Sequence, residues 1–145
     1  MKFSKYKLIH CLMIAVFTFP LIIITNDLWD GSMVSYGFRT DDLSGIKGMY
    51  FESGWHLQYY LYQIVYIISS YTGIKEALIL KIITILSVIG ISKEVKNISI
   101  NTFKMSEKMA YISGYLVLLF PAWFVLVSNV LFLHVLCIYS LLLGY

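Results

Sequence analysis

Carboxylate side chains gather in one polar stretch of the chain, residues 26–56. It holds five of the eight acidic residues: Asp27, Asp30, Asp41, Asp42 and Glu52. Arg39 and Lys47 oppose them, so the stretch carries a net charge of about −3 at neutral pH. Neighbouring carboxylates can coordinate a divalent cation, and a single carboxylate can act as a general base. We therefore expect the chemistry of the protein in this stretch.

Asp27 and Asp30 are the candidates for catalytic residues, and Asp30 and Asp42 are the candidates for ligands of Mg²⁺ or Mn²⁺. The other interpretation of Asp27 and Asp30 is a pair of solvated loop acids. Asp41 and Asp42 precede Leu-Ser-Gly and also suit a turn or a helix cap. At the level of the sequence these interpretations stay open.

Further side chains have the chemistry to bind a substrate: Arg39, Glu52, Trp55, His56, Tyr59 and Lys81. The aromatic rings could stack on sugars or line an acyl chain, and the cations could bind a lipid phosphate. Each residue also has a structural interpretation. Glu52 could cap the helix that follows, His56 could be an interfacial polar residue, and Lys81 could extend along its apolar stem to lipid headgroups. The tyrosines and Trp55 could form an interfacial aromatic belt.

The composition predicts the class of protein that positions these residues. The chain is 59% hydrophobic and 13% charged, whereas a soluble domain is ~25% charged. It therefore predicts an all-α, polytopic membrane protein. The net charge of +3 is too small to indicate a nucleic-acid partner. Cys11 and Cys137 each lie in an apolar run and are expected to pack as small hydrophobic residues rather than to form a disulfide or a metal site.

Apolar runs and charged segments predict one membrane domain, residues 1–145, with about four spans. The spans are expected at 8–25, 76–92, 109–125 and 129–145, because apolar runs of this kind suit a ~30 Å hydrocarbon core. Lysines at positions 2, 5 and 7 place the N-terminus in the cytoplasm, and the basic loop 93–108 is also expected there. The apolar end of the sequence suggests the N-terminal piece of a longer protein. His134 lies in the last span, where an ionisable residue is often functional, although a neutral histidine bonded to a neighbouring helix is the alternative.

Residues 55–72 form an amphipathic helical pattern. Leu57, Leu61 and Ile64 fall on one face at 100° per residue, while Tyr59 and Tyr62 fall on the opposite face. Such a helix could lie in the outer membrane interface, or it could span with its aromatic face toward a protein cavity. The first arrangement puts the basic loop on the cytoplasmic side and is the one we expect. Gly73 is expected to end the helix.

The order of these parts resembles the N-terminal portion of the GT-C class of integral-membrane glycosyltransferases. A first helix is followed by Asn26-Asp27-Leu28-Trp29-Asp30-Gly31, an acidic outer loop, Glu52-Ser53-Gly54-Trp55, and an outer amphipathic helix. The resemblance implies transfer of a sugar from a polyprenyl-phosphate-linked donor at the outer face of a bacterial plasma (inner) membrane. It also implies a loop carboxylate, Asp27 or Asp30, that activates the acceptor or holds a divalent cation.

Two other functions stay open at this point. The first is a small non-catalytic membrane protein, flippase-like or an assembly subunit, that handles a lipid-linked sugar. The second is a fragment of a transporter in which His134 and Lys81 matter more than the loop acids. The expected partners are a polyprenyl-linked sugar donor and membrane lipids, with no nucleic acid. The sequence leaves the oligomeric state open.

Overall fold

The computed structural model describes residues 5–23, 36–37, 40, 43–120 and 132–144. Its helices are α1 (Lys5–Ile23), α3 (Leu43–Glu52), α4 (His56–Thr72), α5 (Glu76–Asn101), α6 (Glu107–Leu118) and α8 (Phe132–Leu143). These parts of the chain are all-helical, in agreement with the prediction. Asp27, Asp30, Arg39, Asp41 and Asp42 lie outside the described residues.

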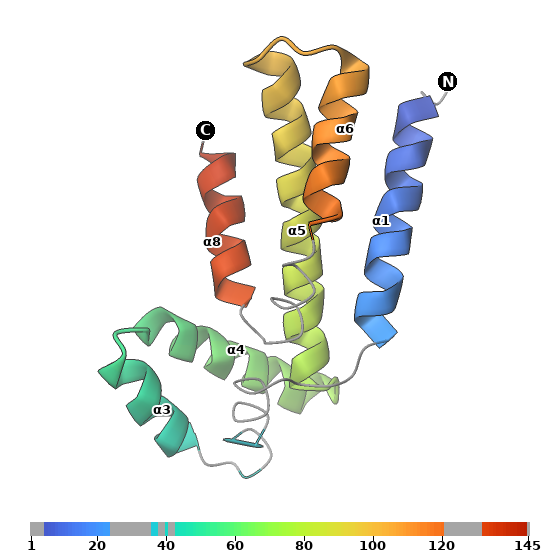
Figure 1. Ribbon diagram of the computed structural model, residues 1–145. Coiled ribbons are helices and arrows are strands. Elements are labelled where there is room, and N and C mark those ends of the chain that lie inside the picture. Colours follow the sequence, from blue (N-terminus) through green and yellow to red (C-terminus); the bar gives the residue numbers. More distant parts are fainter. Residues whose placement is uncertain (1–4, 24–35, 38–39, 41–42, 121–131, 145) are drawn as a thin grey trace.

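Helix α5 is the element on which the others are assembled. It packs against α1, α4, α6 and α8. Figure 1 shows α1, α6 and α8 beside α5, with α4 crossing the lower end of α5 and α3 packed beside α4. The 26 residues of α5 correspond to a helix ~39 Å long. This length lets α5 contact α4 at one end and α1, α6 and α8 along the rest.

Each end of α5 takes part in a different hydrophobic core. At the lower end, Leu80 packs with Ile46 and Tyr50 of α3 and with Tyr59, Tyr62 and Val65 of α4. Higher up, the second core is formed by Phe17, Ile85, Val88, Ile91, Leu118 and Val135, from α1, α5, α6 and α8. Burial of these side chains holds the two groups of helices to one shared helix.

The upper helices approach α5 closely at two glycines. The Ser92 hydroxyl of α5 donates a hydrogen bond of 2.8 Å to the carbonyl of Gly114 in α6. A Cβ added at Gly114 would lie 3.0 Å from the Ser92 carbonyl oxygen. A Cβ at Gly90 would overlap the ring of Tyr139 in α8. Gly114 therefore favours glycine because the Ser92 backbone limits the space, whereas a Cβ at Gly90 would require the Tyr139 ring to shift.

The predicted membrane architecture is wrong. Among the described residues, no helix combines the length and the apolar character that a membrane crossing requires. Helices α6 and α8 have 12 residues each, ~18 Å, against a hydrocarbon core of ~30 Å. Helix α5 is long enough, but it carries Lys81, Lys93 and Glu94 as well as apolar residues. The four predicted spans, 8–25, 76–92, 109–125 and 129–145, and the integral-membrane localisation that depended on them are not supported.

The predicted loop 93–108 differs as well. Helix α5 continues through Gly90 to Asn101, so residues 93–101 are helical. The turn between α5 and α6 is short, and the Ser106 hydroxyl accepts a hydrogen bond from the backbone N–H of Met109 at the start of α6. Lys93, Lys96 and Lys108 lie on helices, whereas Lys104 lies in the turn, with φ 52°.

The predicted helix at 55–72 is present as α4. Gly73 ends it in the left-handed conformation, with φ 69°, and donates its backbone N–H to the carbonyl of Ser69. The aromatic face is the buried one, since Tyr59 and Tyr62 are 6% and 2% exposed. The aliphatic face, including Leu57 and Ile64, is exposed. The sequence period was thus right, and the tyrosines pack against α3 and α5.

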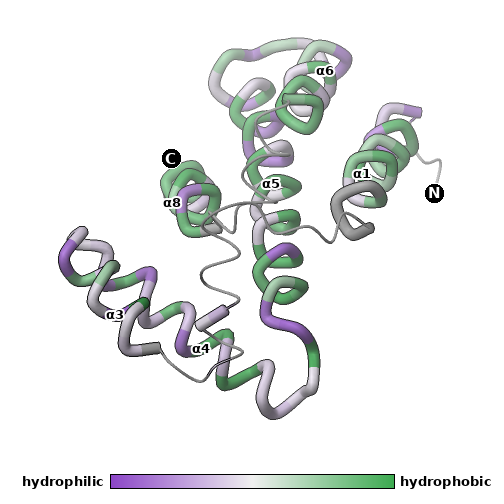
Figure 2. The backbone as a smooth tube through the Cα atoms, turned by 60° about the horizontal axis from the view of Figure 1, so that its bottom comes forward, coloured by the Kyte–Doolittle hydropathy of each residue, from purple (hydrophilic) through white to green (hydrophobic). Residues whose placement is uncertain are grey.

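Large apolar side chains are also exposed on other helices. On α1 they are Leu8, Leu12, Val16 and Phe19, which recur at helical spacing. Figure 2 shows strongly hydrophobic residues along α1, α5 and α8. The molecule therefore presents apolar surface as well as apolar cores.

Candidate ligand groove between α4 and α8

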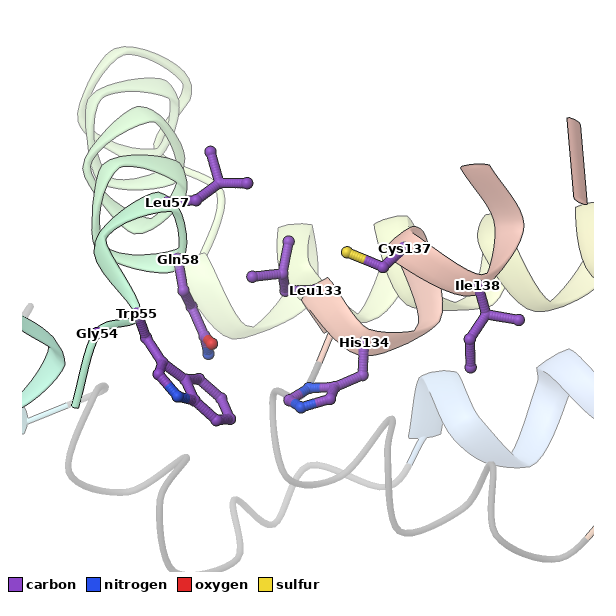
Figure 3. Close-up of a pocket in the computed structure, with 8 residues that line it drawn as sticks. All are labelled: Gly54, Trp55, Leu57, Gln58, Leu133, His134, Cys137 and Ile138. Atoms are coloured by element: carbon purple, nitrogen blue, oxygen red, sulfur yellow. The ribbon is translucent and has the colours of Figure 1, made fainter. Parts of the chain in front are cut away.

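An apolar groove lies between the start of α4 and the first turns of α8. Its cavity has a volume of about 480 Å³, within the range of small-molecule sites. It is lined by Gly54, Trp55, Leu57, Gln58, Leu133, His134, Cys137 and Ile138 (Figure 3). A second cavity of about 550 Å³ shares Leu57, Leu133 and Cys137 with the first and extends to Leu61 and Leu141. The two cavities adjoin at these shared residues and are together called the groove.

The turn between α3 and α4 positions the polar end of the groove. Gly54 has φ 76°, a left-handed conformation that glycine adopts without strain. The backbone N–H of Trp55 donates to the carbonyl of Tyr50 over 2.7 Å, and that of Gln58 donates to the carbonyl of Trp55 over 3.1 Å. Trp55 and Gln58 are three residues apart and face the same side at the start of α4.

Helical spacing on α8 supplies the opposite wall. Leu133, Cys137 and Leu141 follow one another at intervals of four residues, so they form one stripe along the helix. His134 lies beside this stripe, and its ring centroid is 5.1 Å from that of Trp55, with the rings tilted by 57°. Trp55 and His134, 79 positions apart in the sequence, therefore meet at one end of the groove.

Gln58 carries the most unusual polar atom of the groove. Its side chain is 1% exposed. Its Nε2 donates a hydrogen bond of 3.0 Å to the hydroxyl of Tyr62, whereas its Oε1 is buried and has no hydrogen-bond partner in the part of the chain that the structure describes. Figure 3 shows the end of Gln58 beside the Trp55 ring, on the side that faces His134. A buried acceptor without a donor costs ~1–3 kcal/mol, so a ligand donor at this point would be favourable.

The residues predicted to bind substrate lie in different environments. Trp55 lines the groove, and Glu52 is exposed at the end of α3. His56 is exposed and contacts the ring of Phe51, with 4.4 Å between centroids. Tyr59 is buried, and its hydroxyl accepts a hydrogen bond from Nε2 of Gln63 over 2.8 Å.

Lys81 does not line the described part of this groove, and the candidate metal ligands lie outside the described residues. Lys81 is 5% exposed and lies within α5. Asp27, Asp30, Arg39 and Asp42 are outside the described residues, so their roles stay predictions. Within the described residues, no three His, Cys, Asp or Glu side chains come together as metal ligands. The divalent cation likewise stays a prediction.

Sequence reasoning did not single out Gln58, Leu133 or Cys137. Gln58 could have been noticed, because it lies one turn after Trp55 in a helix that has no charged residue. Leu133 gave no such signal, since it resembles every other apolar residue of its run, and Cys137 was expected to pack as a small hydrophobic residue, whereas it is exposed and lines both cavities. Their role depends on the approach of α8 to α4, which no local pattern encodes.

A second polar cluster joins α1 to α6. His10 lies between two tyrosine rings of α6, with centroids 5.8 Å from Tyr111 and 5.6 Å from Tyr115. The ammonium group of Lys96 lies 5.2 Å from the centroid of the Tyr111 ring. Burial, and then the charge of Lys96, lower the pKa of His10 below its ordinary value of 6.5. Burial is also the main cause that raises the pKa values of Tyr111 and Tyr115.

Comparisons of the chain with protein-family models, with curated proteins and with solved structures found no match.

Proposed function

We propose that the protein binds an amphipathic molecule in the groove between α4 and α8. The apolar chain of the ligand lies along the leucines of the groove, and its polar end lies beside Trp55, Gln58 and His134. The observation that carries this proposal is the buried, unpartnered Oε1 of Gln58 at the end of an otherwise apolar groove.

The dimensions and lining of the groove favour a lipid-like chain. Leu133 and Leu141 are eight residues apart on α8, a distance of ~12 Å along the helix. Each methylene group transferred from water into such a groove contributes ~0.8 kcal/mol. A chain that fills the groove would therefore provide most of the affinity, and the polar end would provide orientation.

The described residues form a site that can bind an apolar chain with a polar end. Transfer of a sugar from a polyprenyl-phosphate donor depends on Asp27 or Asp30, which lie outside the described residues. The non-catalytic alternative, handling of a lipid-linked molecule, needs a site for an apolar chain with a polar end. The groove has that character, which supports a binding role.

Cys137 provides a direct assay, because it is exposed and lines both cavities. With Cys11 replaced by serine, Cys137 is the remaining thiol of the chain. Its rate of reaction with a water-soluble maleimide is measured against increasing concentrations of decanol. We expect decanol to slow the reaction to a plateau at saturation.

A matched pair of substitutions tests where decanol binds. Leu133→Gln lies in the groove and should weaken protection of Cys137 about tenfold, because a polar group enters the apolar wall. Leu116→Gln, at an exposed position of α6, should leave protection unchanged. Labelling that does not respond to decanol, or that responds equally in the two variants, contradicts the proposal.

A further inference from the structure

We infer that the polar end of the ligand is a neutral hydrogen-bond donor, a hydroxyl group, rather than a carboxylate or a phosphate. This inference rests on the proposed function and concerns the chemical class of the molecule that the groove accepts. Three features of the polar end carry it: the hydrogen bonding of Gln58, the absence of a lysine or arginine among the described lining residues, and the rings beside Gln58.

The hydrogen bonding of Gln58 selects for a donor. An amide side chain has an NH₂ group that donates and an oxygen that accepts. One hydrogen of the Gln58 NH₂ group is donated to the hydroxyl of Tyr62, whereas Oε1 accepts no hydrogen bond from the described residues. A ligand hydroxyl can donate its hydrogen to Oε1, whereas an ionised carboxylate or phosphate brings further acceptors and no hydrogen for it.

The charges around the groove disfavour an anion. No lysine or arginine occurs among the described residues that line the two cavities. An anionic end would therefore be desolvated beside Oε1 without a permanent cation, and burial of an unpaired charge is far more costly than burial of a hydroxyl. Lys81, which the sequence suggested for a lipid phosphate, is buried in α5 and does not line the groove.

The neighbouring rings complete the environment of a hydroxyl. Trp55 carries an indole N–H, which only donates, and His134 carries ring nitrogens that can donate or accept. A hydroxyl oxygen accepts as well as donates, so it can use Oε1 and a ring N–H at the same time. The two rings contact each other, with centroids 5.1 Å apart, so they form one wall at this end of the groove.

A pair of ligands of equal chain length tests the inference in the unaltered site. Protection of Cys137 is measured with decanol and with decanoate at pH 8, in the Cys11→Ser protein. We expect decanol to bind at least tenfold more tightly, which corresponds to about 1.4 kcal/mol. Equal binding, or tighter binding of decanoate, would overturn the inference and leave the groove as a site for apolar chains. If neither ligand protects Cys137, the proposed function itself fails.

Two glutamines of α4 provide matched variants. Gln58 donates to Tyr62, and Gln63 donates to Tyr59, each across one helical turn. Gln58→Met keeps the approximate length of the side chain but removes the acceptor, so the preference for decanol over decanoate should fall to threefold or less. Gln63→Met removes a similar amide away from the groove and should retain the tenfold preference.

The comparison of Gln58→Met with Gln63→Met can support or contradict the role of Oε1 as the acceptor. A preference that survives Gln58→Met, or that disappears in both variants, contradicts the assignment of Oε1 as the acceptor. Far-ultraviolet circular dichroism shows whether each variant is folded. If Gln58→Met does not fold, the decanol and decanoate comparison in the unaltered site decides alone.

Discussion

His10 shows how a single ionisable side chain is tied to the packing of two helices. Its ring lies against Tyr111 and Tyr115, and its Nδ1 is buried without a hydrogen-bond partner in the described part of the chain. Both burial and the nearby Lys96 favour the neutral imidazole, so the pKa is lowered in the folded state. Uptake of a proton by His10 therefore opposes the contact between α1 and α6.

The sign of the pH dependence follows from this shift. The unfolded chain binds the His10 proton more tightly than the folded chain does. The contribution of neutral His10 to stability is complete above pH 6.5 and is lost as the pH falls toward the lower, folded-state pKa. We expect the free energy of unfolding in urea to decrease over this interval, and His10→Gln to reduce the decrease. An unchanged slope in His10→Gln would contradict the assignment.

At the residue scale, the sequence was most informative for the rare polar and aromatic side chains. Trp55 and His134 were singled out, and the structure brings them together. Tyr59 was singled out for the same chemistry, but it lies in the α3–α4 core, because an aromatic ring packs in a core as readily as it binds a ligand. Gln58 was missed, since its importance comes from one buried oxygen.

At the scale of the helices, the packing of α6 against α5 depends on how closely the two backbones approach each other at Gly114. Where α5 meets α6, the carbonyl of Gly114 accepts a hydrogen bond from the Ser92 hydroxyl. A helical glycine usually costs ~0.5–1 kcal/mol relative to alanine. At Gly114 that cost is offset by a helix–helix contact that a Cβ would obstruct.

Two glycine substitutions separate these effects. Gly45→Ala in α3 places its Cβ in open space and should raise the free energy of unfolding by ~0.5–1 kcal/mol. Gly114→Ala places its Cβ 3.0 Å from the backbone oxygen of Ser92, so we expect a loss of ~1–3 kcal/mol. Chemical denaturation measures both. A gain in stability for Gly114→Ala would show that α6 can move away from α5 at little cost.

The sequence predicted the boundaries of α4 correctly but not the C-terminal end of α5. The boundaries of α4 followed from its period and from Gly73, and the structure agrees with them. The end of α5 was missed, because Gly90 and the lysines after Ser92 resemble a break followed by a basic loop. In the structure Gly90 accommodates the ring of Tyr139, a long-range contact that local sequence does not reveal. The membrane spans were predicted from the lengths of apolar runs, which do not show where each helix begins and ends; α6 and α8 have only 12 residues each.

At the scale of the whole molecule, two hydrophobic cores share α5. The upper core draws on α1, α5, α6 and α8, and the lower core on α3, α4 and α5. The ligand groove lies where α4 and α8, one from each group, come near each other. Its shape therefore depends on both cores, although neither core lines it completely.

The shared helix has a consequence for the order in which the chain folds. Helices α5 and α6 are separated only by residues 102–106, whereas α1 must return to them across more than fifty residues of sequence. Closing a short loop costs less entropy than closing a long one, so local contacts form early. We expect the α5–α6 hairpin to be structured in the folding transition state and α1 to dock after it.

Two side chains of the same core distinguish early from late docking. Leu118 lies in α6 and Phe17 lies in α1, and both are buried against α5. Leu118→Ala should mainly slow folding, while Phe17→Ala should mainly accelerate unfolding, as stopped-flow kinetics in urea would show. The reverse pattern would place the docking of α1 before the hairpin. If the expected order holds, a chain emerging from the ribosome keeps its first helix unpacked until α5 and α6 have been synthesised.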